Sequence, residues 1–265
     1  MIDCHCHLDS FVRSGEPPEI LERAAAAGIV QMVATGTNTD DWPIYRALAE
    51  AFPQRIFYTV GVHPTELSEN FDAQLDALER FLAAETAFPP VAVGEIGLDE
   101  HSLPKDAPAD AGRICAHQAE AFARQLEIAK RADLPIVIHS REAFEKTVEI
   151  IDASGADWRR IDFHCFSEDE AQVRALNGRG ARASFTGTLT YKNAHNVRRA
   201  ALAQGTERLM LETDCPYLAP QKLRGKRNEP AFLRHTAEFA AELFGMTFAE
   251  IERITERNTR AFFGF

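Results

Sequence analysis

The sequence lacks the features of a secreted, membrane-bound or disulfide-stabilised protein. Its five cysteines are odd in number and widely spaced, so we expect free thiols in a reducing compartment and no disulfide framework. No apolar run reaches the roughly 18 residues that a membrane span needs. The chain opens directly on a strand-like segment, so we expect no cleavable leader. We therefore expect a soluble, cytoplasmic protein with no membrane association and no evident obligate protein partner.

Positive charge is also in short supply. The chain carries 29 Lys and Arg against 40 Asp and Glu, a net charge of -11. This balance argues against a protein that coats nucleic acid through bulk electrostatics, because such binding depends on clustered basic residues. It does not exclude an enzyme that acts on nucleic acid, since bound divalent cations and a local basic patch can replace a global positive field.

Apolar, β-branched-rich runs recur through the 265 residues, and no linker or charge block divides them, so one domain covering residues 1–265 is predicted. Eight runs are expected to be strands: Met1–Leu8, Ile29–Thr35, Ile56–Val62, Val91–Leu98, Leu134–His139, Arg160–Phe166, Ala181–Thr188 and Leu209–Thr213. Nine stretches are expected to be helices, the last two after the final strand: Pro17–Ala27, Trp42–Ala51, Phe71–Ala84, Gly112–Arg131, Glu142–Ala153, Glu168–Asn177, Asn193–Ala203, Glu229–Phe244 and Phe248–Phe263.

This alternation fits either a closed (β/α)8 barrel or an open doubly wound sheet. The open sheet should carry a Gly-rich turn after its first strand, whereas this chain has His5-Cys6-His7-Leu8-Asp9 there. The predicted fold class is therefore α/β, a TIM (β/α)8 barrel. Two long segments, Asp99–Asp110 and Pro216–Asn228, are expected to be loops, the first of them at the catalytic mouth.

Six potential metal ligands lie at or just past the ends of the predicted strands, where a barrel enzyme assembles its chemistry. They are His5, His7, Glu95, His139, His164 and Asp214. His5 and His7 share one face of their strand, because successive side chains alternate, while Cys4 and Cys6 are expected to face the surrounding helices. Structural histidines are the alternative interpretation, but several of them beside a carboxylate favour a metal site.

Glu95 is a carboxylate in an otherwise apolar strand, where an unpaired charge is costly and a cation is a natural partner. Gly94 and Gly97 on either side would allow other groups to approach closely. Because a carboxylate can bridge two ions and an imidazole cannot, we expect Glu95 to be a bridging ligand, with a structural ion pair as the alternative. Asp214 comes next to the first strand when the barrel closes, where it can bind metal and accept a proton from a bound water.

Three further carboxylates could orient these ligands by hydrogen bonds to the side of the imidazole that faces away from the metal. Glu212 has the same strand parity as Asp214 and lies one pleat deeper, where it could hold the distal N–H of a metal-bound imidazole. Asp9 and Asp99 could act in the same way, or could cap a loop or helix instead.

The same segments strongly resemble the TatD family of metal-dependent deoxyribonucleases within the amidohydrolase superfamily, nearly from end to end. The matching segments are Ile2–Asp9, Gly61–Pro64, Gly94–Asp99, Pro135–Arg141, Phe163–Ser167, Leu211–Pro220 and Gly225–Pro230. Any one motif is weak, but the ordered series is highly specific. Two positions depart from the family pattern: Glu100-His101 stands where an aromatic residue usually follows, and Leu223 stands where many relatives have His.

The resemblance implies two divalent metal ions, whose identity the residues leave open among zinc, manganese, magnesium, cobalt and nickel. One would be held by His5, His7, Glu95 and Asp214, and the other by Glu95, His139 and His164. It also implies hydrolysis of DNA phosphodiester bonds, commonly from a 3′ end, with single-stranded or 3′-end DNA as the nucleic acid substrate. His63 and Arg141 match family positions near the substrate phosphate.

The predicted mechanism has a metal-activated water attacking phosphorus while Asp214 takes its proton and Glu95 bridges the ions. A basic loop would help His63 and Arg141 to position phosphate; it contains Arg224, Lys226 and Arg227, which could equally be solvated surface charges. The rival function is attack on a carbonyl, as in an amidohydrolase or esterase such as a D-aminoacyl-tRNA deacylase or a lactonase. A third hypothesis, a binding protein that has lost its activity, conflicts with an intact ligand set.

Overall fold

Eight parallel strands form one sheet whose spatial order follows the chain from β1 to β8. The computed structural model describes residues 1–265, except for the side chains of Pro17 and Pro18. The strands are β1 (Ile2–Cys6), β2 (Gln31–Ala34), β3 (Ile56–Val60), β4 (Ala92–Asp99), β5 (Ile136–Arg141), β6 (Ile161–Phe163), β7 (Arg182–Phe185) and β8 (Met210–Leu211). The α-helices are α1 (Asp9–Arg13), α2 (Pro17–Ala26), α3 (Trp42–Ala51), α4 (Phe71–Ala83), α5 (Pro108–Ala132), α6 (Phe144–Ser154), α7 (Glu170–Arg179), α8 (His195–Gln204), α9 (Leu233–Phe244) and α10 (Phe248–Phe263).

Residues just past β8 close the sheet onto β1. The Asp214 N–H donates to the His5 carbonyl at 3.0 Å, and the His7 N–H donates to the Cys215 carbonyl at 2.8 Å. Parallel strands in sequential order that meet at their two edges define a TIM barrel. The fold predicted from the alternating pattern is therefore confirmed, and closure brings Asp214 beside the first strand as expected.

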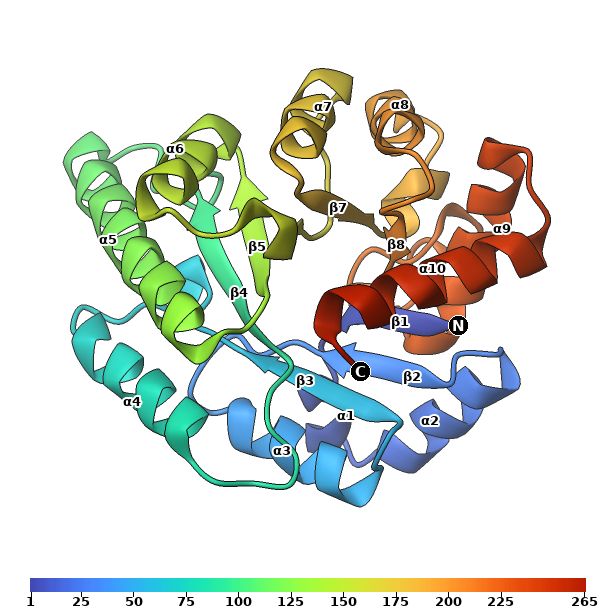
Figure 1. The fold of residues 1–265 in the computed structure, drawn as a ribbon, viewed down its shortest axis with the longest axis horizontal. Coiled ribbons are helices and arrows are strands. Elements are labelled where there is room, and N and C mark those ends of the chain that lie inside the picture. Colours follow the sequence, from blue (N-terminus) through green and yellow to red (C-terminus); the bar gives the residue numbers. More distant parts are fainter.

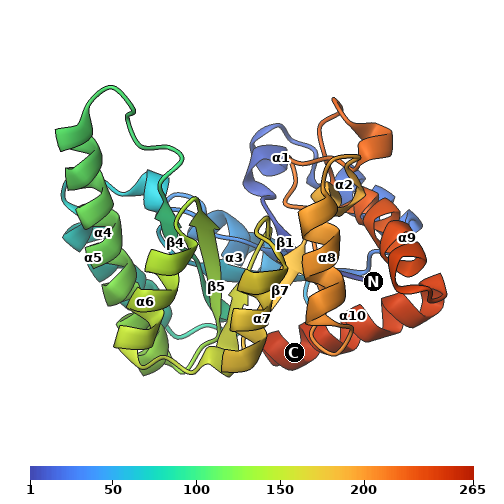
Figure 2. The ribbon, with the colours of Figure 1, turned by 90° about the horizontal axis from the view of Figure 1, so that it is seen from above.

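The helices surround the strands, and α10 crosses one end of the barrel beside β1 and β8 (Figure 1). Strands β4 and β5 point away from α10, so the carboxyl ends of the strands lie at the opposite end (Figure 2). That end is where barrel enzymes carry their sites. Within the described residues, none of the helices combines the length and the apolar character that crossing a membrane requires.

The orientation predicted for Cys4 is wrong, although that of Cys6 is confirmed. Cys6 packs in the large core cluster, and its thiol donates to the Val33 carbonyl. Cys4 instead packs with Val137 and Met210 in a separate cluster, and its thiol lies 3.6 Å from Glu212 Oε2. The physical reason is an irregularity between Asp3 and Cys6, where the pairing of β1 with β2 shifts register and the simple alternation of faces is lost.

Several element boundaries also differ from the sequence-based expectation. Helix α5 begins at Pro108, inside the predicted mouth loop, because proline is well suited to the first turn of a helix. Strand β5 continues to Arg141, two residues beyond its predicted end. The short helix α1 at Asp9–Arg13 was not expected at all. Strands β6 and β8 end earlier than predicted, at Phe163 and Leu211, so His164 directly follows β6 and Asp214 lies just past β8.

Candidate metal centre

Two glycines let β4 approach β5 closely on either side of Glu95. A Cβ added at Gly97 would lie 2.0 Å from the His139 carbonyl oxygen, and one at Gly94 would lie 2.6 Å from Val137 Cβ. Gly97 is paired with His139 across the two strands and has φ +144°. The close approach expected from these glycines is present, and it brings His139 within reach of Glu95.

One oxygen of Glu95 faces a first group of candidate ligands. Glu95 Oε2 lies 3.4 Å from His5 Nε2 and 3.6 Å from His7 Nε2. The two imidazole nitrogens are 3.3 Å apart, and Asp214 Oδ1 lies 3.7 Å and 3.2 Å from them. Four ligands about 2.1 Å from one zinc ion in a tetrahedron stand about 3.4 Å from one another. This group therefore has the spacing that a single divalent cation requires.

The other oxygen of Glu95 faces a second group. Glu95 Oε1 lies 2.6 Å from His164 Nε2, 2.8 Å from His139 Nδ1 and 3.5 Å from His63 Nε2. The three residues His63, Glu95 and His139 also have ligand atoms close enough to share an ion. Each carboxylate oxygen of Glu95 thus faces a different set of histidines.

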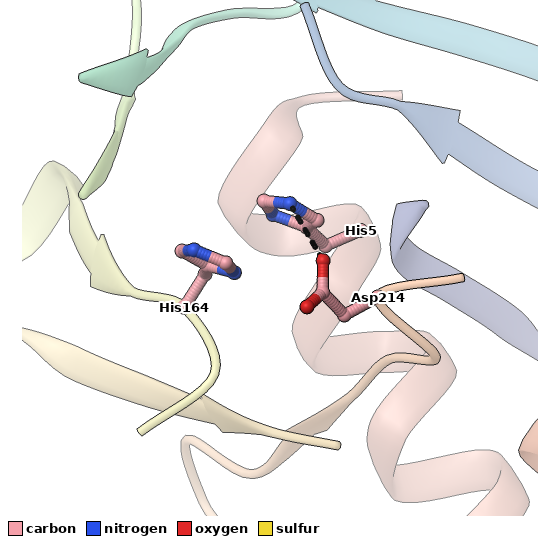
Figure 3. A group of neighbouring side chains, drawn as sticks. All are labelled: His5, His164 and Asp214. Carbon is pink, nitrogen blue, oxygen red and sulfur yellow. Dashed lines mark ion pairs between the residues drawn. The ribbon is translucent and has the colours of Figure 1, made fainter. Parts of the chain in front are cut away.

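Side chains from distant parts of the chain point toward one another at this point (Figure 3). The His5 and His164 rings stack with centroids 3.8 Å apart, and Asp214 approaches His5 from the end of β8. Closure of the barrel is what brings the three together. All six residues predicted as metal ligands are gathered in this cluster.

The far nitrogens of two histidines are held by acceptors behind them. His7 Nδ1 lies 3.1 Å from the Thr35 carbonyl oxygen, and His139 Nε2 lies 3.1 Å from Asp99 Oδ2. Because these oxygens only accept, the facing nitrogens carry the protons, and this leaves His7 Nε2 and His139 Nδ1 for the centre. Asp99 makes this contact with His139 and also accepts from the Ser102 N–H at 2.8 Å, so both of the roles considered for it are present. The Thr35 carbonyl was missed, because a backbone acceptor has no side-chain signal in the sequence.

Glu212 lies directly behind His164. Its Oε1 is 3.6 Å from His164 Nδ1, too long for a hydrogen bond but close enough for a strong charge interaction, and it accepts from the Cys165 N–H at 2.5 Å. Its Oε2 accepts from the Ser184 hydroxyl at 2.6 Å, and the same hydroxyl oxygen lies 2.9 Å from Asp162 Oδ2. Burial, with the charge of Glu212, raises the pKa of Asp162 to about 8, so that carboxyl keeps its proton at pH 7.

Asp9, the remaining supporting candidate, lies on the cavity wall. It accepts from the Tyr45 hydroxyl at 3.1 Å and pairs with Arg13 at 3.5 Å. No hydrogen bond among the described residues joins it to a candidate ligand. Its position is therefore suited to substrate contact or to helix α1 more than to orienting a histidine.

Charge within the cluster is balanced by protons on the histidines. Burial alone would lower the pKa of His7, but the hydrogen bond and charge of Asp214, together with Glu95, raise it to about 9. Burial would raise the pKa of Glu95, yet the histidines around it, His164 first, hold it well below its usual value. The pKa of His5 is lowered by burial and by His164, and its buried Nδ1 has no hydrogen-bond partner among the described residues. Neutral imidazoles and ionised carboxylates are the donors that a divalent cation needs, and a cation can replace these protons.

A cavity of about 790 Å³ opens over the cluster. His63 and the exposed Arg141, the two residues that match family positions near the substrate phosphate, line this cavity. The basic residues of the Pro216–Asn228 loop are not among the described lining residues. Arg227 instead pairs with Glu16 at 2.8 Å, and the Arg224 guanidinium lies 4.5 Å from the Tyr191 ring centroid, while Lys226 is exposed.

A closed barrel that gathers histidines and carboxylates at the carboxyl ends of its strands defines a class, the metal-dependent hydrolase barrels. Within this class the chain belongs to the TatD family, because the family model described as TatD related DNase matches residues 2–264. The resemblance noted from the sequence motifs is thus confirmed.

Individual relatives are similar over their whole length. The chain is 34% identical to the uncharacterised metal-dependent hydrolase YabD of Bacillus subtilis, covering 99% of this chain and 98% of the relative. It is 33% identical to the protein named 3′-5′ ssDNA/RNA exonuclease TatD of Edwardsiella piscicida, covering 99% of both. The crystal structure of YjjV, a TatD homologue from Escherichia coli K12, superposes with a TM-score of 0.90 at 30% identity, covering 100% of this chain and 98% of the other.

Proposed function

We propose that this protein is a divalent-metal-dependent exonuclease that cleaves single-stranded DNA from its 3′ end. The observation that carries the proposal is the position of the Glu95 carboxylate, whose two oxygens face two separate groups of histidines. Two-ion hydrolases that cleave phosphodiesters hold their ions about 3.5–4 Å apart, close enough for one carboxylate to bind both. The exonuclease names of three relatives, such as the one from Edwardsiella piscicida, support this substrate class.

Two ions would be bound by overlapping ligand sets: His5, His7, Glu95 and Asp214 for one, and Glu95, His139 and His164 for the other. When bound, the ions supply an acidified water as nucleophile and positive charge for the phosphate oxygens. A set with four histidines favours zinc, manganese, cobalt or nickel over magnesium. Asp99 and Glu212 would keep His139 and His164 oriented.

The protein's own groups would place the substrate and receive the proton. His63 Nδ1 accepts from the Thr65 N–H at 3.2 Å, so its Nε2 carries the hydrogen, and burial lowers its pKa so that the ring is neutral. It would therefore donate a hydrogen bond to a phosphate oxygen, and Arg141, at the carboxyl end of β5, would add a charged contact. Burial by itself would raise the pKa of Asp214, but His7, His5 and His164 together hold it below its usual value, so the carboxyl stays ionised. Its carboxylate would accept the proton of the attacking water.

The deciding experiment compares three substrates under varied divalent metals after removal of the bound metal by a chelator: labelled single-stranded DNA, a D-aminoacyl-tRNA and a simple lactone. Wild type is expected to shorten the DNA from its 3′ end. Glu95→Gln should lose at least about 100-fold in rate, because it replaces a ligand and not merely a supporting group. Glu66→Gln, which alters another carboxylate lining the same cavity, is the matched control and should stay close to wild type.

The other outcomes distinguish the rival functions. Intact DNA with turnover of the tRNA or the lactone would identify attack on a carbonyl. Stoichiometric metal without hydrolysis of any substrate would identify a binding protein. Full activity of a metal-loaded Glu95→Gln variant would refute the proposed role of that carboxylate.

A further inference from the structure

Tyr217 is an aromatic side chain that stands in solvent at the edge of the cavity. It is 63% exposed, and the two other large hydrophobic side chains described as exposed, Val30 and Leu202, do not line the cavity. Its ring lies edge-on to candidate ligand His7, with centroids 6.3 Å apart. Exposure alone would be unremarkable, but this ring lines the cavity next to a candidate metal ligand, so it stands where a bound substrate would pass.

The backbone that carries Tyr217 is held firmly. Its N–H donates to the Asp214 carbonyl at 3.0 Å, and its own carbonyl accepts from Asn228 Nδ2 at 2.5 Å. Asn228 is fully buried and donates to the Thr213 carbonyl as well, at 2.9 Å. One buried amide therefore ties the turn that carries Asp214 to the turn that carries Tyr217.

The following residues are docked on the short helical turn Gly187–Thr190. A Cβ at Gly187 would lie 2.5 Å from the Leu218 carbonyl oxygen, so the loop approaches to a distance that only glycine permits. The Tyr191 hydroxyl donates to the Ala219 carbonyl at 3.1 Å. Because the segment is fixed on both sides, a ligand that stacks on the ring need not order the backbone first, and this lowers the entropic cost of binding.

We propose that Tyr217 is the stacking platform for a nucleobase of the substrate, at the nucleotide next to the scissile phosphate. The inference rests on the proposed nuclease function and adds a base subsite to it. Every base has a flat π-face, so such a platform accepts all sequences, but it requires a base that is free of its duplex partner and neighbours. A preference for single-stranded ends over paired ends follows from this contact.

The test uses the full-length metal-loaded protein with Tyr217→Ala, Tyr217→Phe and the control Leu202→Ala, which removes an exposed apolar side chain away from the cavity. The substrates are one labelled single strand and versions with an abasic tetrahydrofuran residue at each position near the 3′ end. For the intact strand, Tyr217→Ala should lower kcat/KM by roughly 5- to 150-fold, the range for loss of one stacked base. Tyr217→Phe and Leu202→Ala should remain near wild type.

The abasic substrates separate stacking from a structural effect. When the abasic residue replaces the base that stacks, the kcat/KM of wild type should fall by the same factor that Tyr217→Ala causes on the intact strand. The kcat/KM of Tyr217→Ala should be the same on this abasic strand as on the intact one. An equal loss for Tyr217→Ala on every substrate, or no loss at all, would overturn the base subsite while wild-type cleavage leaves the nuclease function intact.

If wild type cleaves no DNA, the proposed function fails, and fluorescence anisotropy with the same labelled strands decides the inference separately. The subsite would be supported if Tyr217→Ala binds the intact strand at least about 5-fold more weakly than Tyr217→Phe does, and if this difference disappears on the abasic strand. Equal affinity for the two variants would overturn it.

Discussion

Replacing Gly97 by alanine should disable the metal centre through the backbone of a neighbouring strand. The new Cβ would lie 2.0 Å from the His139 carbonyl oxygen, whereas such a contact needs at least about 3.0 Å. Strand β5 must therefore move by about 1 Å, and His139 must move with it. A displacement of this size at a catalytic group costs about 100-fold in rate.

The same substitution should also destabilise the fold. Overpacking costs about 1–3 kcal/mol, and the φ of +144° at Gly97 is strained for alanine and adds about 1–3 kcal/mol. For a chain of 265 residues, the sum lowers the melting temperature by roughly 4–11 °C. The variant should remain folded at room temperature, with less bound metal and weaker DNA cleavage.

The matched control is Gly112→Ala in α5, where an added Cβ meets nothing within 4 Å. It should be neutral or stabilising by about 1 kcal/mol, because alanine is favoured in a helix. Metal analysis, thermal unfolding and the DNA assay are run on both variants. Wild-type metal content and activity in Gly97→Ala would refute the claim that close strand approach positions His139.

Three further changes test the groups around the centre. The pKa of His7 is raised to about 9, and the neighbouring carboxylates raise the pKa values of His139 and His164 as well, against the effect of burial, so a bound ion must displace protons at pH 7. Apparent metal affinity should therefore rise at least about tenfold per pH unit between pH 7 and about 9. Calorimetry in buffers of different ionisation enthalpy should detect proton release, and its absence at pH 7 would contradict this. Asp99→Ala should weaken metal binding or activity by about 10- to 100-fold through His139, measured by competition with a chelating dye. His63→Ala should lower kcat/KM with metal content unchanged, and parallel loss of metal would instead make His63 a ligand.

The barrel and the six candidate ligands were predictable because each ligand is a polar residue that ends or interrupts an apolar run. Burying such a residue costs free energy unless it has a hydrogen-bond, charge or metal partner, so its presence at these positions indicates a binding site. Gly94 and Gly97 were informative for a related reason, since their lack of a side chain indicated close backbone approach.

Other features depended on information that the residue pattern does not carry. Side-chain alternation gave the wrong face for Cys4, because it assumes a regular strand and β1 shifts register. The Thr35 carbonyl that orients His7 is a backbone group and could belong to any residue. The charge of Arg227 was evident, but not its pairing with Glu16, because the two are brought together only by the fold.

The most direct test of the account is anomalous X-ray diffraction from crystals of the protein loaded with zinc or manganese. We predict two metal peaks on either side of Glu95, one bound through Oε2 with His5, His7 and Asp214, the other through Oε1 with His139 and His164. A single peak, or peaks that do not share Glu95, would contradict the bridged two-metal centre on which the proposed nuclease mechanism depends.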